Sequence, residues 1–278
     1  MRSSEELASR ILIGLVRALS NLSLHAYKRG VSEVIVPGKR KPLAPLEARN
    51  HFVSWLYHRR VRGSIDDDLR YDLLKKPRDA GPTSTVEVLN GFEVVETDLW
   101  IARIRPTLPS FAAATPAMWS YAHSLALADV DSWWKKVRPR PRTELEEVNR
   151  QAAAWRWRAE VAGYVLPSRE YRPEMRRYTG RLRELVPLAA RFAAKRRWFK
   201  PERNDFPIYA DPVLVYTDNL DWAEREELLG LARARSSSLR AMLDLDGDMH
   251  SGSDLSANDA WRIMAADSNL PEHPEFPF

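Results

Sequence analysis

The side chains best suited to binding chemistry are arginines that alternate with aromatic residues in the middle of the chain. Guanidinium groups bind phosphates and aromatic rings stack on bases, so the two types together are typical of a nucleic-acid contact. The candidate binding residues are Trp155, Trp157, Arg158, Arg176, Arg177, Arg181, Arg196 and Arg197. Helical spacing favours the competing interpretation, in which Trp155 and Trp198 belong to the core and the cationic side chains extend to water.

Scattered carboxylates offer a second kind of chemistry, metal-assisted hydrolysis. The available acids are Glu93, Glu96, Asp205, Asp211 and Asp218. Whether such side chains converge on one point is a property of the fold and is not visible in the sequence. No residue is therefore assigned a catalytic role.

An acidic run near the C-terminal end partly matches a calcium-binding loop. The run consists of Asp244, Asp246, Asp248, His250 and Asp254. Met249 stands where such a loop needs glycine for its sharp turn, and Leu255 stands where it needs a bidentate carboxylate. We therefore predict a flexible acidic loop and no metal site, with a hard divalent cation as the alternative.

Several well-defined kinds of site are excluded. The sequence has no glycine-rich phosphate-binding pattern, no H-E-x-x-H and no G-x-S-x-G. It has no cysteine, which excludes disulfides, thiolate metal sites and a cysteine nucleophile. His51 and His58 lie two helical turns apart, about 10.5 Å, too far to bind one metal ion together. No cofactor is expected.

Helices must position these side chains, because helix signals recur along the chain. Start signals are Ser3, Pro45, Ser64, Ser84, Thr115, Thr143, Pro173 and Asp221, six of them with an acid three residues later or a proline next to them. Extended structure is indicated only at Val31–Val36 and Val213–Tyr216. The sequence predicts a mainly α fold, a multi-helix globular bundle with at most short, minor β segments.

Two prolines suggest an internal boundary. Pro139 and Pro141 lack a backbone N–H and restrict the residue before them, so the stretch from Arg138 to Arg142 is not helical throughout. We expect an N-terminal helical region over 1–138 and a C-terminal one over 139–278, with one continuous domain as the alternative.

Charge is unevenly distributed along the chain. Residues 138–203 carry 18 basic and 8 acidic residues, whereas residues 204–278 carry 5 and 15. Segments of opposite sign attract, so mutual neutralisation within one fold is the simplest expectation. The N-terminus lacks the pattern of a signal peptide, and no uninterrupted run of about 18 apolar residues occurs. We expect a soluble, cytoplasmic protein without a membrane partner.

Short motifs spread over most of the chain resemble the bacterial domain-of-unknown-function family 4272. They are the opening Glu5–Arg10 helix, Trp55-Leu56, Asn90–Glu93 with Leu99-Trp100, Leu108-Pro109, Arg140–Arg142 with Leu145–Glu147, Trp157–Ala159, and Asp205-Phe206 with Tyr209. The chain departs from the family after its last long helix, where an acidic loop follows Leu243. The resemblance implies a helical fold and a bacterial origin, and it implies no activity.

These observations favour a non-enzymatic helical protein that binds another protein, with a basic middle segment and an acidic C-terminal segment. Nucleic-acid binding through the Arg- and Trp-rich segment 155–200 is the first alternative. A metal-assisted hydrolase is the second.

Overall fold

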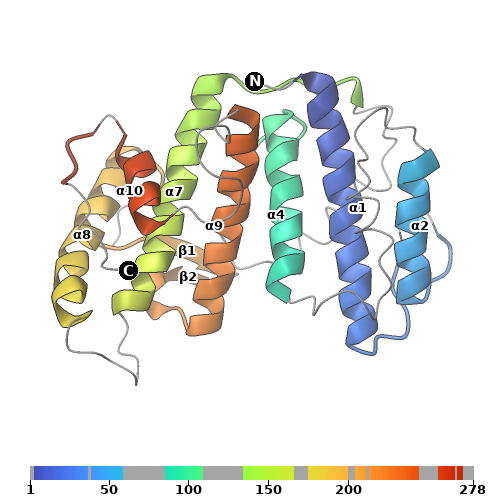
Figure 1. Cartoon of the computed structure of the whole chain (residues 1–278), viewed down its shortest axis with the longest axis horizontal. Helices are drawn as coiled ribbons and strands as arrows, with labels where there is room; N and C mark the ends of the chain where they lie inside the picture. Colours follow the sequence, from blue (N-terminus) through green and yellow to red (C-terminus); the bar gives the residue numbers. More distant parts are fainter. Residues whose placement is uncertain are drawn as a thin grey trace. The chain divides into compact units, whose positions relative to one another are not determined.

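The structure is a computed structural model that describes residues 3–36, 39–58, 85–108, 134–165, 175–199, 204–210, 213–243, 256–266 and 268–271. These residues contain seven α-helices and one small sheet (Figure 1). The helices are α1 (Ser4–Lys28), α2 (Pro45–His58), α4 (Thr85–Ile101), α7 (Arg142–Val165), α8 (Met175–Lys195), α9 (Trp222–Leu243) and α10 (Ala257–Ala265). The mainly α fold predicted from the sequence is confirmed.

The chain forms two compact units. In the described residues it passes from the first unit to the second between Arg140 and Pro141, two residues beyond the expected boundary. Arg140 is tied to the first unit: its backbone N–H donates to Ile101 at 2.9 Å, and its guanidinium donates to the carbonyl of Trp100 at 2.7 Å. The same guanidinium lies 4.5 Å from the Trp100 ring centroid.

In the first unit, α1 packs against both α2 and α4. The capping box predicted at Ser3 is present, because Ser3 Oγ accepts from the Glu6 N–H at 3.1 Å and Glu6 accepts from the Ser3 N–H at 2.7 Å. These bonds satisfy backbone donors at the helix start. The apolar face that the helix buries includes Leu7, Ile11, Leu15 and Leu19.

The core of the first unit also contains ionised side chains on α4. Glu96 is buried and accepts two hydrogen bonds from Arg105, at 2.6 and 2.9 Å. Asp98 is fully buried and accepts from Arg10 of α1 at 2.8 Å. A buried carboxylate is tolerated when a cation pairs with it and fills its lone pairs. These two arginines therefore permit α4 to bury both carboxylates.

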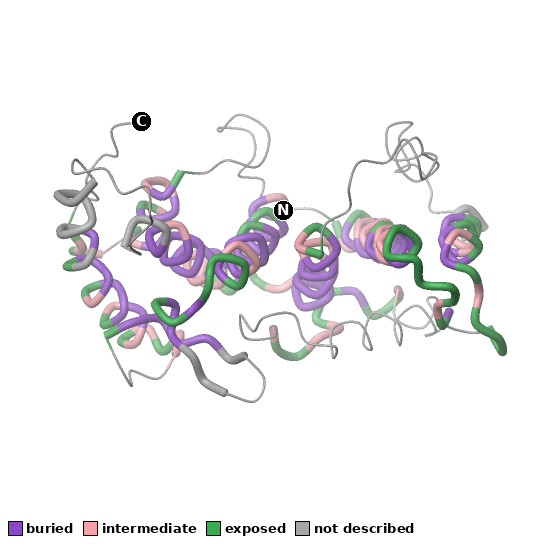
Figure 2. Tube along the Cα trace, turned by 90° about the horizontal axis from the view of Figure 1, so that it is seen from below, coloured by how far each residue is buried: buried purple, intermediate pink, exposed green. Residues whose placement is uncertain are grey.

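In the second unit, α7 packs against α8, α9 and α10. A two-stranded antiparallel sheet, β1 (Pro207–Ala210) and β2 (Val213–Tyr216), leads into a 3-10 helix, η1 (Thr217–Asn219), that precedes α9. Figure 2 shows long buried stretches within the helices. The extended structure predicted at Val213–Tyr216 is thus confirmed as β2.

One predicted helix start is wrong by one residue. α7 begins at Arg142, so Thr143 lies inside its first turn and is not the residue that precedes it. The carbonyl of Pro141 accepts from the N–H groups of Glu144 and Leu145, at 3.0 and 3.2 Å. Pro141 thus closes the first turn, and its own missing N–H costs nothing at that point.

One helix, α1, is long and apolar enough to pass a length-and-composition test for a membrane span. In its most apolar 18-residue window, 67% of the residues are buried inside the protein. Core helices pass the same test, and the packing of α1 on α2 and α4 accounts for its apolar face.

Some predicted features lie outside the described residues. They are the helix starts at Ser64, Ser84, Thr115 and Pro173, the acid Asp211, and the acidic loop from Asp244 to Asp254.

Candidate functional site

The two tryptophans proposed as surface contacts are buried instead. Trp155 is 5% exposed and Trp157 is fully enclosed. Trp155 meets Phe206 edge-on, with ring centroids 5.3 Å apart, and Trp157 lies 4.7 Å from the ring of Trp261 in α10. Their placement as binding residues is therefore wrong, because these rings pack α7 against Phe206, just before β1, and against α10.

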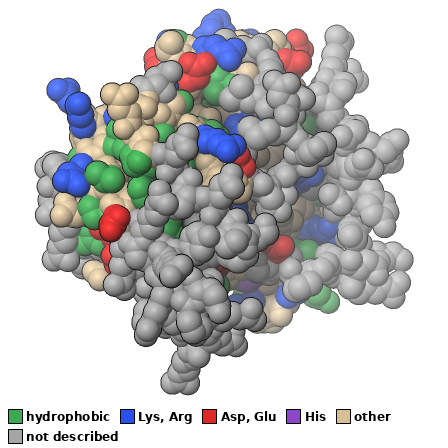
Figure 3. Space-filling view, turned by 60° about the vertical axis from the view of Figure 1, so that its left-hand side comes forward, with side chains coloured by type: hydrophobic (Ala, Val, Ile, Leu, Met, Phe, Trp, Pro, Cys, Tyr) green, Lys and Arg blue, Asp and Glu red, His purple; other side chains and the backbone are tan. Residues whose placement is uncertain are grey.

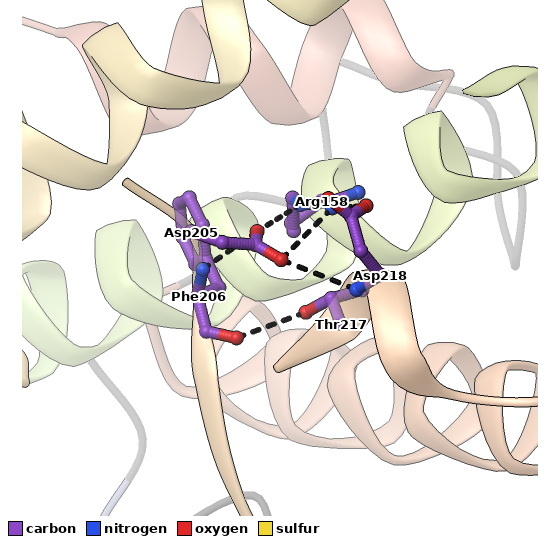
Figure 4. Close-up of polar contacts among 5 residues, drawn as sticks. All are labelled: Arg158, Asp205, Phe206, Thr217 and Asp218. Atoms are coloured by element: carbon purple, nitrogen blue, oxygen red, sulfur yellow. Dashed lines mark hydrogen bonds and ion pairs between the residues drawn. The ribbon is translucent and has the colours of Figure 1, made fainter. Parts of the chain in front are cut away.

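Arg158, the third neighbouring candidate, is also fully buried and forms the centre of a polar cluster (Figure 4). Its Nε donates to Asp205 Oδ1 at 2.6 Å, and its Nη2 donates to Asp205 Oδ2 at 3.2 Å. The same Nη2 donates to Asp218. Arg158 is thus not available to a partner, and we refer to Arg158, Asp205 and Asp218 as the Arg158 cluster.

The hairpin explains why two acids 13 positions apart meet at one arginine. β1 and β2 are paired in a register that sets Pro207 opposite Tyr216, so the residues just outside both strands are neighbours. Thr217 Oγ1 donates to the Phe206 carbonyl at 3.1 Å, and the Asp218 N–H donates to Asp205 Oδ2 at 3.1 Å. The cluster therefore anchors the open end of the hairpin to α7.

A second buried arginine, Arg225, lies on the first turn of α9 close to the Arg158 cluster. Burial lowers the pKa of Arg225 below its ordinary value; Glu226 counteracts this shift, and the positive charge of Arg158 adds to it. Arg225 still carries its charge at neutral pH, as arginine does in proteins. The Nη1 groups of Arg158 and Arg225 are buried, and each lacks an acceptor among the described residues.

Arg225 supports the one tryptophan that is exposed in the described part of the chain. The Arg225 guanidinium lies 3.9 Å from the ring centroid of Trp222, and Trp222 is 65% exposed. Exposed acids flank this ring in sequence, namely Asp218, Asp221 and Glu224. We call Trp222 with these three acids the Trp222 surface.

The first turn of α9 is closed by a reciprocal cap. The Asp221 N–H donates to Glu224 at 2.9 Å, and the Glu224 N–H donates to Asp221 at 2.9 Å, which confirms the predicted cap. Trp222 stands inside this cap but is not among the binding residues predicted from the sequence, because a single exposed aromatic residue has no sequence pattern. The Asp221–Glu224 cap was the feature of the sequence that could have drawn attention to this turn.

The remaining predicted binding residues lie on α8 and just after it. Arg196 donates to Glu147 at 3.2 Å and rests over the Phe192 ring, whereas Arg197 is exposed. Arg176, Arg177 and Arg181 lie on α8, and their side chains are outside the description. On the face shown in Figure 3, the described basic and acidic side chains are interspersed, with hydrophobic ones between them.

The described acids considered for metal-assisted hydrolysis bond mainly to arginines of their own unit. Asp205 and Asp218 bond to Arg158, while Glu96 bonds to Arg105. Glu93 lies one turn from Glu96 on α4 and accepts from Thr97 at 3.4 Å. In the described ranges, no group of three or more metal-ligating side chains is placed to hold an ion.

Comparisons with protein-family models, curated proteins and solved structures found no match. The resemblance to family 4272 therefore stays a prediction from the sequence.

Proposed function

We propose that this chain is a non-enzymatic protein-binding protein, and that the Trp222 surface contacts a partner with a basic surface. The observation that supports the proposal most directly is a tryptophan that is 65% exposed yet held in place by a buried cation 3.9 Å below its ring. Tryptophan is among the residues that contribute most binding energy in protein interfaces.

The support beneath Trp222 matters because binding must repay the entropy of ordering a side chain. Arg225 is itself buried on α9, and the reciprocal cap between Asp221 and Glu224 fixes the turn that carries Trp222. The ring is therefore ordered before a partner arrives. One face of the indole rests on Arg225, and the exposed remainder is left for a partner.

Charge around Trp222 favours a basic partner. Asp218, Asp221 and Glu224 are exposed, and the nearby cations Arg158 and Arg225 are buried. A partner therefore meets an apolar ring with three exposed carboxylates close to it in the sequence. Complementary charge of this kind raises the association rate and weakens as salt increases.

The basic middle segment offers less support for nucleic-acid binding. Of its described arginines, Arg142, Arg150 and Arg156 pair with Glu146, Glu147 and Glu160 within α7. Exposed cations at the end of α8, Lys195 and Arg197, keep nucleic acid as the alternative for that helix.

The test is affinity capture with the tagged full chain from its native host, at low and high salt, analysed for protein and for nucleic acid. Trp222→Ala should lose a partner that the wild-type chain retains, with affinity lowered about 30-fold, equivalent to roughly 2 kcal/mol. The control is Leu188→Ala, which removes another partly exposed apolar side chain of the same unit.

The outcomes are distinct. A stoichiometric protein retained by wild type and by Leu188→Ala, and lost by Trp222→Ala with its helical content intact, supports the proposal. Equal retention by all three chains contradicts it. Recovery of nucleic acid only at low salt, without dependence on Trp222, would instead support nucleic-acid binding through α8.

A further inference from the structure

The end of α1 and the segment that follows it form the most exposed mixture of apolar and basic side chains among the described residues of the first unit. We call residues 27–43 the basic arm, apart from residues 37 and 38, which the description omits. Its exposed apolar side chains are Tyr27, Val31 and Ile35, and Ile35 is 75% exposed. Its exposed cations are Lys28, Arg29, Lys39, Arg40 and Lys41.

Backbone hydrogen bonds give the basic arm a defined shape. Gly30 adopts φ +72°, which lets the chain leave α1 sharply, and the Val31 N–H donates to Ala26 at 3.0 Å. Val34 and Leu43 then exchange two antiparallel bonds, of 2.8 and 3.0 Å. The second half of the arm therefore runs back beside the first.

This pairing brings the cations to the apolar side chains. With Val34 opposite Leu43, an antiparallel register sets Ile35 opposite Pro42, next to Lys41. Lys28 and Arg29 stand at the other end of the arm, beside Tyr27. The only acid in the described part of the arm is Glu33, so its net charge is strongly positive.

Burial of the neighbouring residues shows that the exposed apolar side chains are not simply part of a loose end. Val36 is 1% exposed and anchors the arm to the unit, while Ile35 beside it points away from the core. An extended segment alternates its side chains in this manner. The anchored backbone thus presents Ile35 to the surroundings.

We propose that the basic arm docks on an anionic lipid surface, with Ile35 and Val31 entering the acyl boundary and the five cations lying among the headgroups. An aliphatic tip, an amphipathic tyrosine and a surrounding cluster of Lys and Arg is the composition that membrane interfaces favour. Protein interfaces more often centre on Trp, Tyr or Arg that fit into pockets, which describes the Trp222 surface better.

The expectation of no membrane partner rested on the lack of a signal-peptide pattern and of a long apolar run in the sequence. Surface docking requires no apolar run, only a few exposed apolar side chains together with basic ones. Exposed apolar side chains alone, or basic side chains alone, bind a membrane weakly, whereas the two together bind it firmly. The arm supplies both within 15 residues of sequence.

The experiment is sedimentation of the full chain with vesicles of phosphatidylcholine, alone or mixed with phosphatidylserine, over a range of salt. Binding should require phosphatidylserine and weaken with salt. The triple variant Lys39→Ala, Arg40→Ala, Lys41→Ala should bind roughly 100-fold more weakly, and Ile35→Ser roughly tenfold more weakly.

The matched control is the double variant Lys135→Ala, Lys136→Ala, which removes two exposed cations elsewhere in the same unit. It should bind like wild type. If this control weakened vesicle binding as much as the triple variant does, the net charge of the chain would explain the binding. That result would overturn the proposal for the arm.

Insertion has a separate readout, because the chain contains no cysteine. Ile35→Cys gives a unique site for an environment-sensitive dye, whose emission should shift to the blue on phosphatidylserine vesicles. Lys136→Cys should show no shift. Absence of wild-type binding at low salt, or arm-dependent binding to polyglutamate but not to vesicles, would overturn the proposal. Both tests are independent of Trp222, so they separate this proposal from the protein-binding one.

Discussion

In the ion pairs of Glu96, Asp98 and Arg158, the more deeply buried member is a carboxylate in the first unit and a guanidinium in the second. In the first unit the buried ions are the carboxylates of Glu96 and Asp98, and their cationic partners reach the surface, with Arg105 28% and Arg10 20% exposed. In the second unit the fully buried ion is the guanidinium of Arg158; its partner Asp205 is 10% exposed and its partner Asp218 is 54% exposed. In each of these pairs one ion is more deeply buried than its counter-ion, which lies nearer to water.

This difference shows which substitution should harm each unit. Removing the outer partner leaves the inner ion without compensation in a region of low dielectric, and that is the costly event. The inner ion is a cation in one unit and an anion in the other. The most harmful substitution should therefore remove an acid from the second unit and an arginine from the first.

The largest effect is expected for Asp205→Ala in the second unit. The change deletes both bonds to Arg158 and two acceptors for backbone N–H groups, those of Phe206 and Asp218. We expect a loss of about 3–5 kcal/mol in the free energy of unfolding, measured by urea denaturation. The control Lys195→Ala changes an exposed residue and should stay within about 0.5 kcal/mol.

A double variant sharpens this prediction. Adding Arg158→Met to Asp205→Ala removes the buried guanidinium, which the single change leaves with Asp218 alone of its two acids, and the apolar side chain fills part of its space. The double variant should be more stable than Asp205→Ala alone. If the two losses simply add, Arg158 and Asp205 are not energetically coupled and the account of the cluster is wrong.

The mirrored prediction for the first unit is Arg105→Ala. It leaves Glu96, which is 2% exposed, without its two bonds from the guanidinium. We expect a loss of about 2 kcal/mol, smaller than for Asp205→Ala because Arg105 is partly exposed and water can occupy its place. Arg103→Ala, two residues away, is the control, and a loss equal to that of Arg105→Ala would contradict the special role of Glu96.

The comparison also shows what could be predicted from the sequence. Helix starts at Ser3 and Asp221 depend on contacts three residues apart, so local pattern was sufficient to predict them. Strand β2 was visible as a short apolar run. Local pattern also placed the division of the chain near Pro139 and Pro141.

The candidate site could not be predicted in the same way. Arg158 contacts acids 47 and 60 positions away, and no local rule links them. The composition of the Trp155–Arg158 stretch suits both a surface and a core, and burial distinguishes the two. The exposed Trp222 and the basic arm could not be predicted from the sequence, because the exposure of a single side chain depends on the packing of the whole unit.

The smallest effect concerns the surroundings of the basic arm and is expected at His51 of α2. Burial lowers the pKa of His51, and the positive charge of Lys39 lowers it further. Lys39→Ala should therefore raise this pKa toward the ordinary value of 6.5 without reaching it, since burial remains. The measurement is a proton NMR titration of the histidine ring, with Lys136→Ala as the control.

The sign of the stability effect follows from proton binding. Because the folded-state pKa of His51 lies below the unfolded value, the unfolded chain binds the proton more readily. The contribution of His51 to stability is fully present above pH 6.5. It falls as the pH drops below the pKa of the unfolded state and toward the lower pKa of the folded state. Lys39→Ala should reduce this loss of stability at acidic pH. An unchanged titration would place Lys39 too far from His51 to act on it, and it would remove the electrostatic link between the arm and α2.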